Sequence, residues 1–314
     1  MTKLHISSTP HIHQKGSSTR NIMLDVVIAL LPAAVAGIVI FGISALWTIL
    51  TCVITAVLAE YIFNLCAHKK QTVGDLSAVV TGLLLALNLS TAVPLWQCAV
   101  GSVFAIVVVK CFFGGIGKNI VNPAIASRVF MLLTFGAVGA VALPTVVEIT
   151  SGATPLAALN QGAEIAAAEA PSVMDLFLGL HGGAIGETCG LALLLGFAYL
   201  VVRKVIKWYV PASFVATTFL CYLISGGFDV VFALQHVLAG GLLLGAIFMA
   251  TDYVTTPNTG LGRVVFCVGA GLLTFAIRQF GMFPEGVSIA ILTMNLLTPF
   301  ISDFTKKKTL GGIR

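Results

Sequence analysis

One stretch of this chain, Gly82-Leu83-Leu84-Leu85-Ala86-Leu87, returns later as Gly241-Leu242-Leu243-Leu244-Gly245-Ala246. A second motif follows each copy in the same order. Phe113-Gly114 precedes Asn122-Pro123-Ala124-Ile125, and Phe280-Gly281 precedes Ser288-Ile289-Ala290-Ile291. Two motifs repeated in one order favour an internal duplication over chance similarity between Leu- and Gly-rich runs.

The repeated stretches lie inside apolar runs long enough to cross a bilayer. The chain has 314 residues, of which 58% are hydrophobic and 9% are charged, and its mean hydropathy is +1.04. A soluble domain carries about 25% charged residues, so the solvent of this chain is lipid. We expect about ten transmembrane helices, near residues 22–42, 45–65, 75–92, 95–113, 122–142, 186–203, 209–225, 230–250, 263–280 and 286–302.

Basic residues predict the orientation. With a cytoplasmic N-terminus, ten spans place most of the 17 Lys and Arg residues on the inner side, as the positive-inside rule requires. The exceptions are Lys110 near an inner end, Arg128 within the fifth span and Arg278 at an outer end. Each half has five spans, and an odd number gives the halves opposite orientations.

The predicted fold is therefore an all-α polytopic membrane protein built from two inverted five-helix repeats. Its expected parts are a cytoplasmic segment 1–21, a first repeat 22–143, an extracytoplasmic loop 144–185, a second repeat 186–302 and a cytoplasmic tail 303–314.

Acidic residues are expected at solvated helix ends, and none is predicted at mid-bilayer, so a carboxylate proton relay is not supported. Asp252 could pair with Arg263, anchor its turn or line an ion path. Arg128, the deepest charge, could snorkel or hold a polar ligand group. The acids near span ends are Asp25, Glu60, Asp75, Glu187, Asp252 and Asp303.

The polar insert contains Ser151-Gly152-Ala153-Thr154-Pro155-Leu156. A threonine hydroxyl is a poor nucleophile without an activating base, and no His or Lys lies within twenty residues of Thr154. We therefore predict no catalytic residue here. Thr154 is either the substrate of another enzyme or part of a Ser/Thr turn that caps a short helix.

A glycine-rich stretch, Phe113-Gly114-Gly115-Ile116-Gly117-Lys118, precedes Asn119 and Asn122. Its spacing does not fit a phosphate-binding loop. The two asparagines either cap the next helix or bind a ligand. The seven cysteines show no ligand spacing, so no metal site is predicted, and the scattered basic residues argue against nucleic acid as a partner.

Several of these stretches together resemble the D subunit of the Rnf-type ion-translocating electron-transport complexes, a paralogue of the B subunit of the Na⁺-translocating NADH:quinone reductase. The resemblance covers essentially the whole chain. The motifs that carry it are Ser8-Thr9-Pro10-His11-Ile12-His13, Phe113-Gly114-Gly115-Ile116-Gly117 with Asn122-Pro123-Ala124, Ser151-Gly152-Ala153-Thr154-Pro155-Leu156, and Phe248-Met249-Ala250-Thr251-Asp252 with Thr256-Pro257. Tyr253 departs from the family pattern, because many relatives have proline at this position. We expect only a looser turn from this difference.

The resemblance implies FMN bound through a phosphoester to Thr154, in the motif that Ser151, Gly152 and Ala153 complete, and installed by a separate flavin transferase that uses FAD. It also implies a urea-transporter-like fold in the bacterial cytoplasmic membrane, and partners that carry flavins and iron–sulfur clusters. The complex would couple electron flow between ferredoxin and NAD to Na⁺ or H⁺ transport. Some relatives also hold riboflavin, for which Asn119, Asn122 and Arg128 are candidates. The alternative is a urea- or vitamin-type transporter without a redox role.

Overall fold

The computed structural model describes residues 5–6, 12–13, 18–136, 156, 159, 172–281 and 285–306. Within these ranges the chain is helical, apart from two short strands, β1 (His5–Ile6) and β2 (Ile12–His13), which pair antiparallel. The first half contains α1 (Thr19–Phe41), α2 (Ile43–Cys66), a 3₁₀ turn η1 (Val73–Asp75), α3 (Ser77–Leu87), α4 (Leu95–Val103) with its π-helical continuation η2 (Phe104–Cys111), and α5 (Pro123–Phe135).

The second half is also helical. It contains α8 (Val173–Leu178), α9 (Gly190–Val202), α10 (Tyr209–Ser225), α11 (Val230–Leu238), α12 (Leu242–Leu244) with its π-helical continuation η4 (Gly245–Met249), α13 (Gly260–Phe280) and α14 (Val287–Thr305). Caps define several of these helices. Ser18 accepts from Asn21 N at the start of α1, and Gly42, with φ 73°, makes the turn from α1 to α2.

Four of the described helices, α1, α2, α13 and α14, are long and apolar enough to cross a membrane. A fifth span results if α11 and Leu242–Met249 count as one helix, bent by 67° at its break. The chain is thus a multi-pass membrane protein. Five shorter apolar helices lie in other predicted spans, so the total of ten stays a prediction. The third predicted span ends early, at Leu87, and residues 137–142 of the fifth lie outside the described part.

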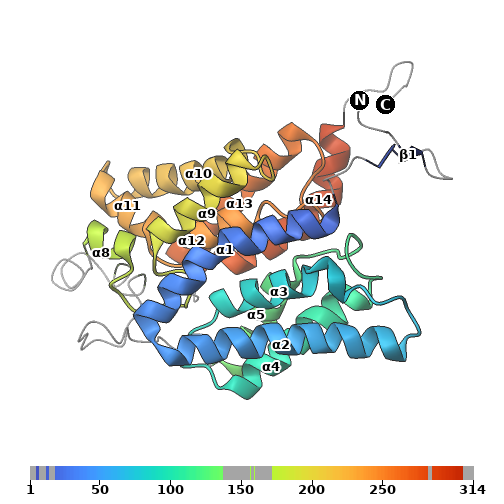
Figure 1. Ribbon diagram of the computed structural model, residues 1–314. Coiled ribbons are helices and arrows are strands. Elements are labelled where there is room, and N and C mark those ends of the chain that lie inside the picture. Colours follow the sequence, from blue (N-terminus) through green and yellow to red (C-terminus); the bar gives the residue numbers. More distant parts are fainter. Residues whose placement is uncertain are drawn as a thin grey trace, which may run out of the picture.

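The helices form two groups on either side of α1. Figure 1 shows α2, α3, α4 and α5 on one side of α1 and the helices of the second half on the other. Between the groups, α1 packs against α9 and α5 contacts α14. Within them, α2 packs on α3 and α4, while α10 packs on α11 and α13. The contacts between the two groups therefore include α1 with α9 and α5 with α14.

Both copies of the repeated stretch lie in the core. Every residue from Thr81 to Leu87 is buried, and so is every residue from Gly241 to Ala250. Close helix packing here needs small residues. A Cβ on Gly82 would stand 2.8 Å from the carbonyl oxygen of Cys52 and 2.9 Å from Cα of Val53, both in α2. Small residues allow such backbone approach between membrane helices.

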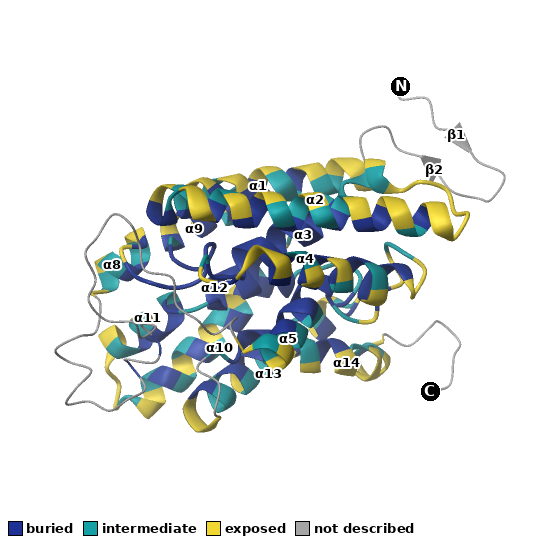
Figure 2. Cartoon of the chain, turned by 90° about the horizontal axis from the view of Figure 1, so that it is seen from below, coloured by how far each residue is buried: buried dark blue, intermediate teal, exposed yellow. Residues whose placement is uncertain are grey.

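The outer faces of the long helices are apolar. Val39 is 65% exposed, Trp47 55% and Phe300 72%. Figure 2 shows exposed residues along the outward faces of α1 and α2 and buried residues facing inward. A surface of this kind is stable in contact with lipid.

Candidate functional site: a pocket between the two halves

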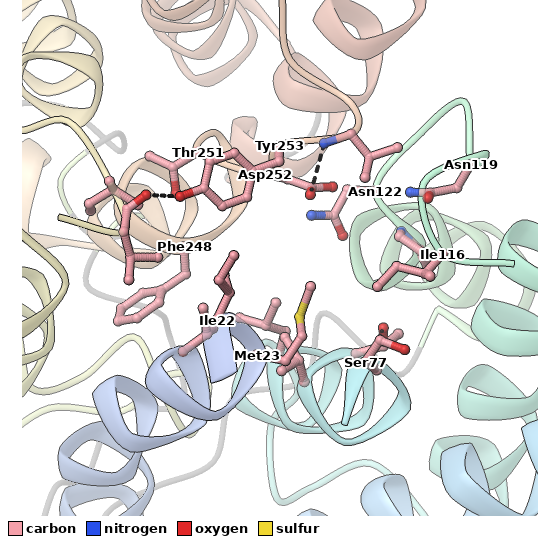
Figure 3. A pocket seen from close by; sticks show the side chains of 18 of the residues that line it. Ile22, Met23, Ser77, Ile116, Asn119, Asn122, Phe248, Thr251, Asp252 and Tyr253 are labelled. Atoms are coloured by element: carbon pink, nitrogen blue, oxygen red, sulfur yellow. Dashed lines mark hydrogen bonds between the residues drawn. The ribbon is translucent and has the colours of Figure 1, made fainter. Parts of the chain in front are cut away.

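A cavity of about 110 Å³, partly open to the surface, lies where the first and second halves meet (Figure 3). Its walls come from α1, α3, the loop before α5 and the turn after η4. Its lining is mostly apolar with a few polar groups, which is the composition typical of small-molecule sites. The polar lining consists of Ser77, Thr81, Lys110, Asn119, Asn122, Thr251, Asp252 and Tyr253.

The glycine-rich loop brings the two predicted asparagines to this cavity. Gly114, Gly115 and Gly117 have φ values of 110°, 94° and 87°, which a residue with a side chain adopts only with strain. The loop then enters α5 through Asn122, whose Oδ1 accepts from Ala124 N at 3.0 Å and from Ile125 N at 3.4 Å. The capping role predicted for Asn122 is confirmed. Asn119 Nδ2 donates to the carbonyl of Val121 at 3.1 Å, and its side chain also faces the cavity.

Asp252 is another polar residue in the lining of this cavity. Its carboxylate accepts from Val254 N at 3.3 Å and from the Thr255 hydroxyl at 3.0 Å. Burial raises the pKa of this carboxyl, while the two donors act in the other direction. Of the three alternatives for Asp252, the turn anchor is confirmed. The predicted pairing with Arg263 is wrong, because Arg263 Nε donates to the carbonyl of Pro257 instead, at 3.0 Å.

Tyr253 does more than loosen the turn, so that expectation is wrong. Its hydroxyl donates to the carbonyl oxygen of Val205, in the connection between α9 and α10. The Tyr253 side chain thereby lines the cavity and joins the turn after η4 to the connection between α9 and α10. Proline at this position could make neither contact.

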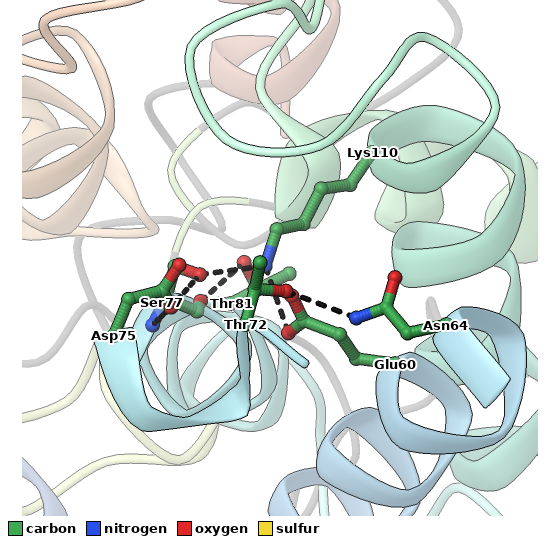
Figure 4. A network of polar contacts seen from close by, with 7 residues as sticks. All are labelled: Glu60, Asn64, Thr72, Asp75, Ser77, Thr81 and Lys110. Carbon is green, nitrogen blue, oxygen red and sulfur yellow. Dashed lines mark hydrogen bonds and ion pairs between the residues drawn. The ribbon is translucent and has the colours of Figure 1, made fainter. Parts of the chain in front are cut away.

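A chain of polar groups, buried at Glu60, Ser77 and Lys110, adjoins the cavity (Figure 4). Lys110 Nζ, which also lines the cavity, donates to Glu60 Oε2 at 2.9 Å and to the Ser77 hydroxyl at 2.6 Å. Thr72 donates to Glu60 Oε1 at 2.6 Å, and Ser77 donates to Asp75. Glu60 is 1% exposed and Lys110 3%, so this pair is shielded from solvent.

Arg128 lies in a separate charged cluster. Its guanidinium donates to Asn88 Oδ1 at 2.7 Å, to Glu187 Oε1 at 3.1 Å and to Glu285. The connection before α9 is fixed to the end of α3, because Ile185 N donates to Leu89 O and Gly186 N to Leu87 O. This places Glu187 against Arg128. The structure therefore brings Asn119 and Asn122 together and keeps Arg128 away from them.

The same cluster borders the break between α11 and α12. A Cβ on Gly241 would stand 2.7 Å from Glu187 Oε1 and 3.5 Å from Arg128 Nη1. From another side, Arg278 donates to the carbonyls of His236 at 2.7 Å and Ala239 at 3.2 Å. A membrane helix can be interrupted only where such partners satisfy its carbonyls.

The expectation that the acids mark solvated helix ends is wrong for Glu60 and Glu187. Both are buried in ion pairs, with exposures of 1% and 3%. The sequence held one signal for these pairs, since Lys110 and Arg128 fall inside apolar runs and a buried cation requires a counter-charge. It did not identify which acids supply that charge.

The predicted attachment motif Ser151, Gly152, Ala153 and Thr154 lies outside the described residues. Leu156, which closes the hexapeptide, is described and is 1% exposed. Leu156 packs with Leu159, with Leu176 of α8 and with Ala239, which follows α11. In the described part of the chain, no group of three or more His, Cys, Asp and Glu side chains is placed to hold a metal ion.

Fold and site together define a helical membrane protein with a polar-lined pocket between its halves and a broken helix beside its Arg128 cluster. More specifically, the chain belongs to the NQR2, RnfD, RnfE family, whose model matches residues 5–311.

Its relatives carry the names of components of redox complexes. It is 46% identical to the D subunit of the Na⁺-translocating ferredoxin:NAD⁺ oxidoreductase complex of Acetobacterium woodii, over 98% of this chain and 95% of the relative. It is 40% identical to the D subunit of the proton-translocating ferredoxin:NAD⁺ oxidoreductase complex of Clostridium ljungdahlii, over 98% and 96%. It is 35% identical to the D subunit of the ion-translocating oxidoreductase complex of Stutzerimonas stutzeri, over 94% and 93%.

Proposed function

We propose that this chain is the D-type membrane subunit of a redox-driven, ion-translocating ferredoxin:NAD⁺ oxidoreductase complex, with FMN covalently bound to Thr154. The observation that carries the proposal is full-length similarity to relatives with that name, in a chain that keeps the Ser-Gly-Ala-Thr motif. The relatives are named for different ions, Na⁺ and H⁺, so the similarity does not select one.

The surroundings of the motif support a fixed position for a flavin on Thr154. Only Pro155 separates Thr154 from the buried Leu156, and the two Cα-to-Cα steps span at most ~7 Å. In the attachment reaction, the Thr154 hydroxyl oxygen forms a bond to the FMN phosphorus of FAD, AMP leaves, and the hydroxyl proton is released. The chain offers no base near Thr154 in sequence, so a separate transferase supplies the activation.

We further propose that the pocket between the halves holds a second, non-covalent flavin, riboflavin. The amides of Asn119 and Asn122 suit the carbonyl and N–H edge of the isoalloxazine ring, and Phe248 offers an apolar face. When bound, a flavin supplies one- and two-electron transfer. The chain contributes position and electrostatics, and buried Lys110 places a positive charge at the pocket wall.

The fold proposed for this function has ten spans in two inverted halves, similar to urea transporters. The pairing of α1 with α9 and of α5 with α14 supports it, because equivalent surfaces meet across a two-fold axis. We place the termini in the cytoplasm of a bacterial cell and the Thr154 loop outside. The basic residues Lys69, Lys70, Arg203 and Arg263 all follow or precede helices on the proposed inner side.

Electrons would enter and leave this subunit through partners. The described cysteines are all free, and the sequence has no cysteine spacing suited to iron–sulfur ligation. Flavin- and iron–sulfur-containing subunits of the complex would therefore exchange electrons with the flavins held here.

The test is a denaturing gel viewed under ultraviolet light, with the chain co-produced with its flavin transferase. The wild-type band should fluoresce, the Thr154→Ala band should not, and a Thr145→Ala control, also in the polar insert, should retain the signal. A dark wild-type band beside a fluorescent substrate of the same transferase would refute the covalent flavin. Solute uptake by the isolated subunit in liposomes would instead favour the transporter alternative.

A further inference from the structure

A second cavity, of about 140 Å³, adjoins the pocket between the halves. The two cavities share Val205 and Tyr253 in their walls, and the hydrogen bond from Tyr253 to the Val205 carbonyl joins those walls. The second cavity differs in charge. Lys204, Lys207 and Arg263 line it, and no acidic residue among the described ones does.

Different elements bring these three cations together. Lys204 follows the end of α9 in a left-handed conformation, with φ 58°, and its N–H donates to the carbonyl of Val201 at 3.0 Å. Lys207 precedes α10, and its Nζ lies 5.8 Å from the centre of the Tyr209 ring. Arg263 comes from the first turn of α13. Like charges around one cavity repel each other, and a bound anion offsets that repulsion.

The threonine hydroxyls of this cavity already donate to backbone carbonyls, so the three cations are its main hydrogen-bond donors. Thr251 donates to the carbonyl of Ile247 at 2.6 Å, and Thr256 to that of Asp252 at 2.5 Å. Arg263 Nε donates to the carbonyl of Pro257, and Arg263, Lys204 and Lys207 all line the cavity. Guanidinium and ammonium groups are the side chains that recognise phosphate.

Exposed apolar side chains flank the three cations in the sequence. Val202 is 78% exposed, Trp208 64% and Leu261 67%, and each stands within two residues of one of the cations. A basic hollow with apolar flanks matches a phospholipid, whose phosphate needs cations and whose acyl chains need lipid-facing side chains. We propose that this cavity binds the phosphate group of an anionic phospholipid of the surrounding membrane.

Trp208 provides the probe for this site. In a variant with Trp47→Phe and Trp96→Phe, it is the one tryptophan left of the three in the chain. The variant is reconstituted in vesicles with brominated phosphatidylglycerol or brominated phosphatidylcholine, and quenching of Trp208 reports the lipid beside it. We expect stronger quenching by the anionic lipid, and a preference that falls about fivefold for each cation removed by Lys204→Gln and Lys207→Gln.

Lys69→Gln with Lys70→Gln is the matched control, since it removes two cations at the end of α2, away from this cavity, and should leave the preference unchanged. A further experiment adds inorganic phosphate to the vesicles with brominated lipid. Phosphate should compete only weakly with the lipid, because the site also requires acyl chains. Equal quenching by both lipids would overturn the proposal. So would equal losses in the cavity and control variants, or full displacement by millimolar phosphate. Retained helical circular dichroism confirms that each variant is folded.

Discussion

Replacement of Arg128 by methionine tests the buried charge cluster most severely. Arg128→Met keeps most of the side-chain volume but leaves Glu187 without its cation. The Glu187 side chain is 2% exposed and cannot recover hydration, whereas that of Glu285 is 25% exposed and partly can. Breaking a buried ion pair costs about 3–5 kcal/mol, and most of that cost should come from Glu187. Loss of the hydrogen bond to Asn88 acts in the same direction.

The assay is reversible unfolding in mixed micelles, followed by helical circular dichroism as sodium dodecyl sulfate is added. Arg128→Met should lower the free energy of unfolding by about 3–5 kcal/mol. The double variant with Glu187→Gln should lose less, because the stranded charge is gone. Lys306→Met is the matched control, since its pair with Asp303 is 68% and 70% exposed and should contribute no more than ~1 kcal/mol. A loss below ~1 kcal/mol in Arg128→Met, or no recovery in the double variant, would refute the reasoning.

Three further predictions follow from local geometry. Gly82→Ala should destabilise the fold by about 1–3 kcal/mol, because its Cβ meets the α2 backbone, while Gly74→Ala, with nothing within 4 Å, should have little effect in the same unfolding assay. Lys110→Met should lower the reduction potential of a flavin in the pocket, because the anionic reduced ring loses a nearby cation. Spectroelectrochemical titration measures this potential, and it would show no shift if the pocket holds no flavin. Burial raises the pKa of Asp252 in the folded chain above its unfolded value of ~3.9. The unfolded chain therefore loses this proton first, and the free energy of unfolding falls as the pH rises above ~3.9. Asp252→Asn should therefore gain thermal stability relative to wild type as the pH rises above about 4, and an unchanged difference would contradict the burial of this carboxyl.

Much of the helical framework could be predicted from hydropathy. The run 22–42 corresponds to α1 and the run 45–65 to α2, with small shifts at their ends. Periodicity could not show where an apolar run breaks. The third run ends at Leu87 because Asn88 turns its side chain back to the carbonyl of Leu84, at 2.7 Å, and then contacts Arg128. That break depends on a partner forty residues away.

The pocket was only partly predictable. The glycines of the 113–118 stretch and the two asparagines indicated an irregular loop, and both asparagines do line the cavity. Asp252 was also singled out, yet its place in the same cavity as Asn122 depends on how the two halves pack. The pairing of Glu60 with Lys110 joins residues fifty positions apart. Hydropathy and local spacing contain no information about such contacts, which form only when helices assemble.

The covalent FMN on Thr154 is the central feature of the proposed function. Intact-mass spectrometry of the chain, co-produced with its flavin transferase, measures it directly, and fragmentation of the peptide that contains Ser151 to Leu156 assigns the site. The mass of the wild-type chain should exceed that of the unmodified chain by one FMN phosphoester increment. This increment should lie on Thr154 and be absent from Thr154→Ala. An unmodified wild-type chain, in a preparation whose transferase modifies a control substrate, would contradict the covalent attachment of FMN.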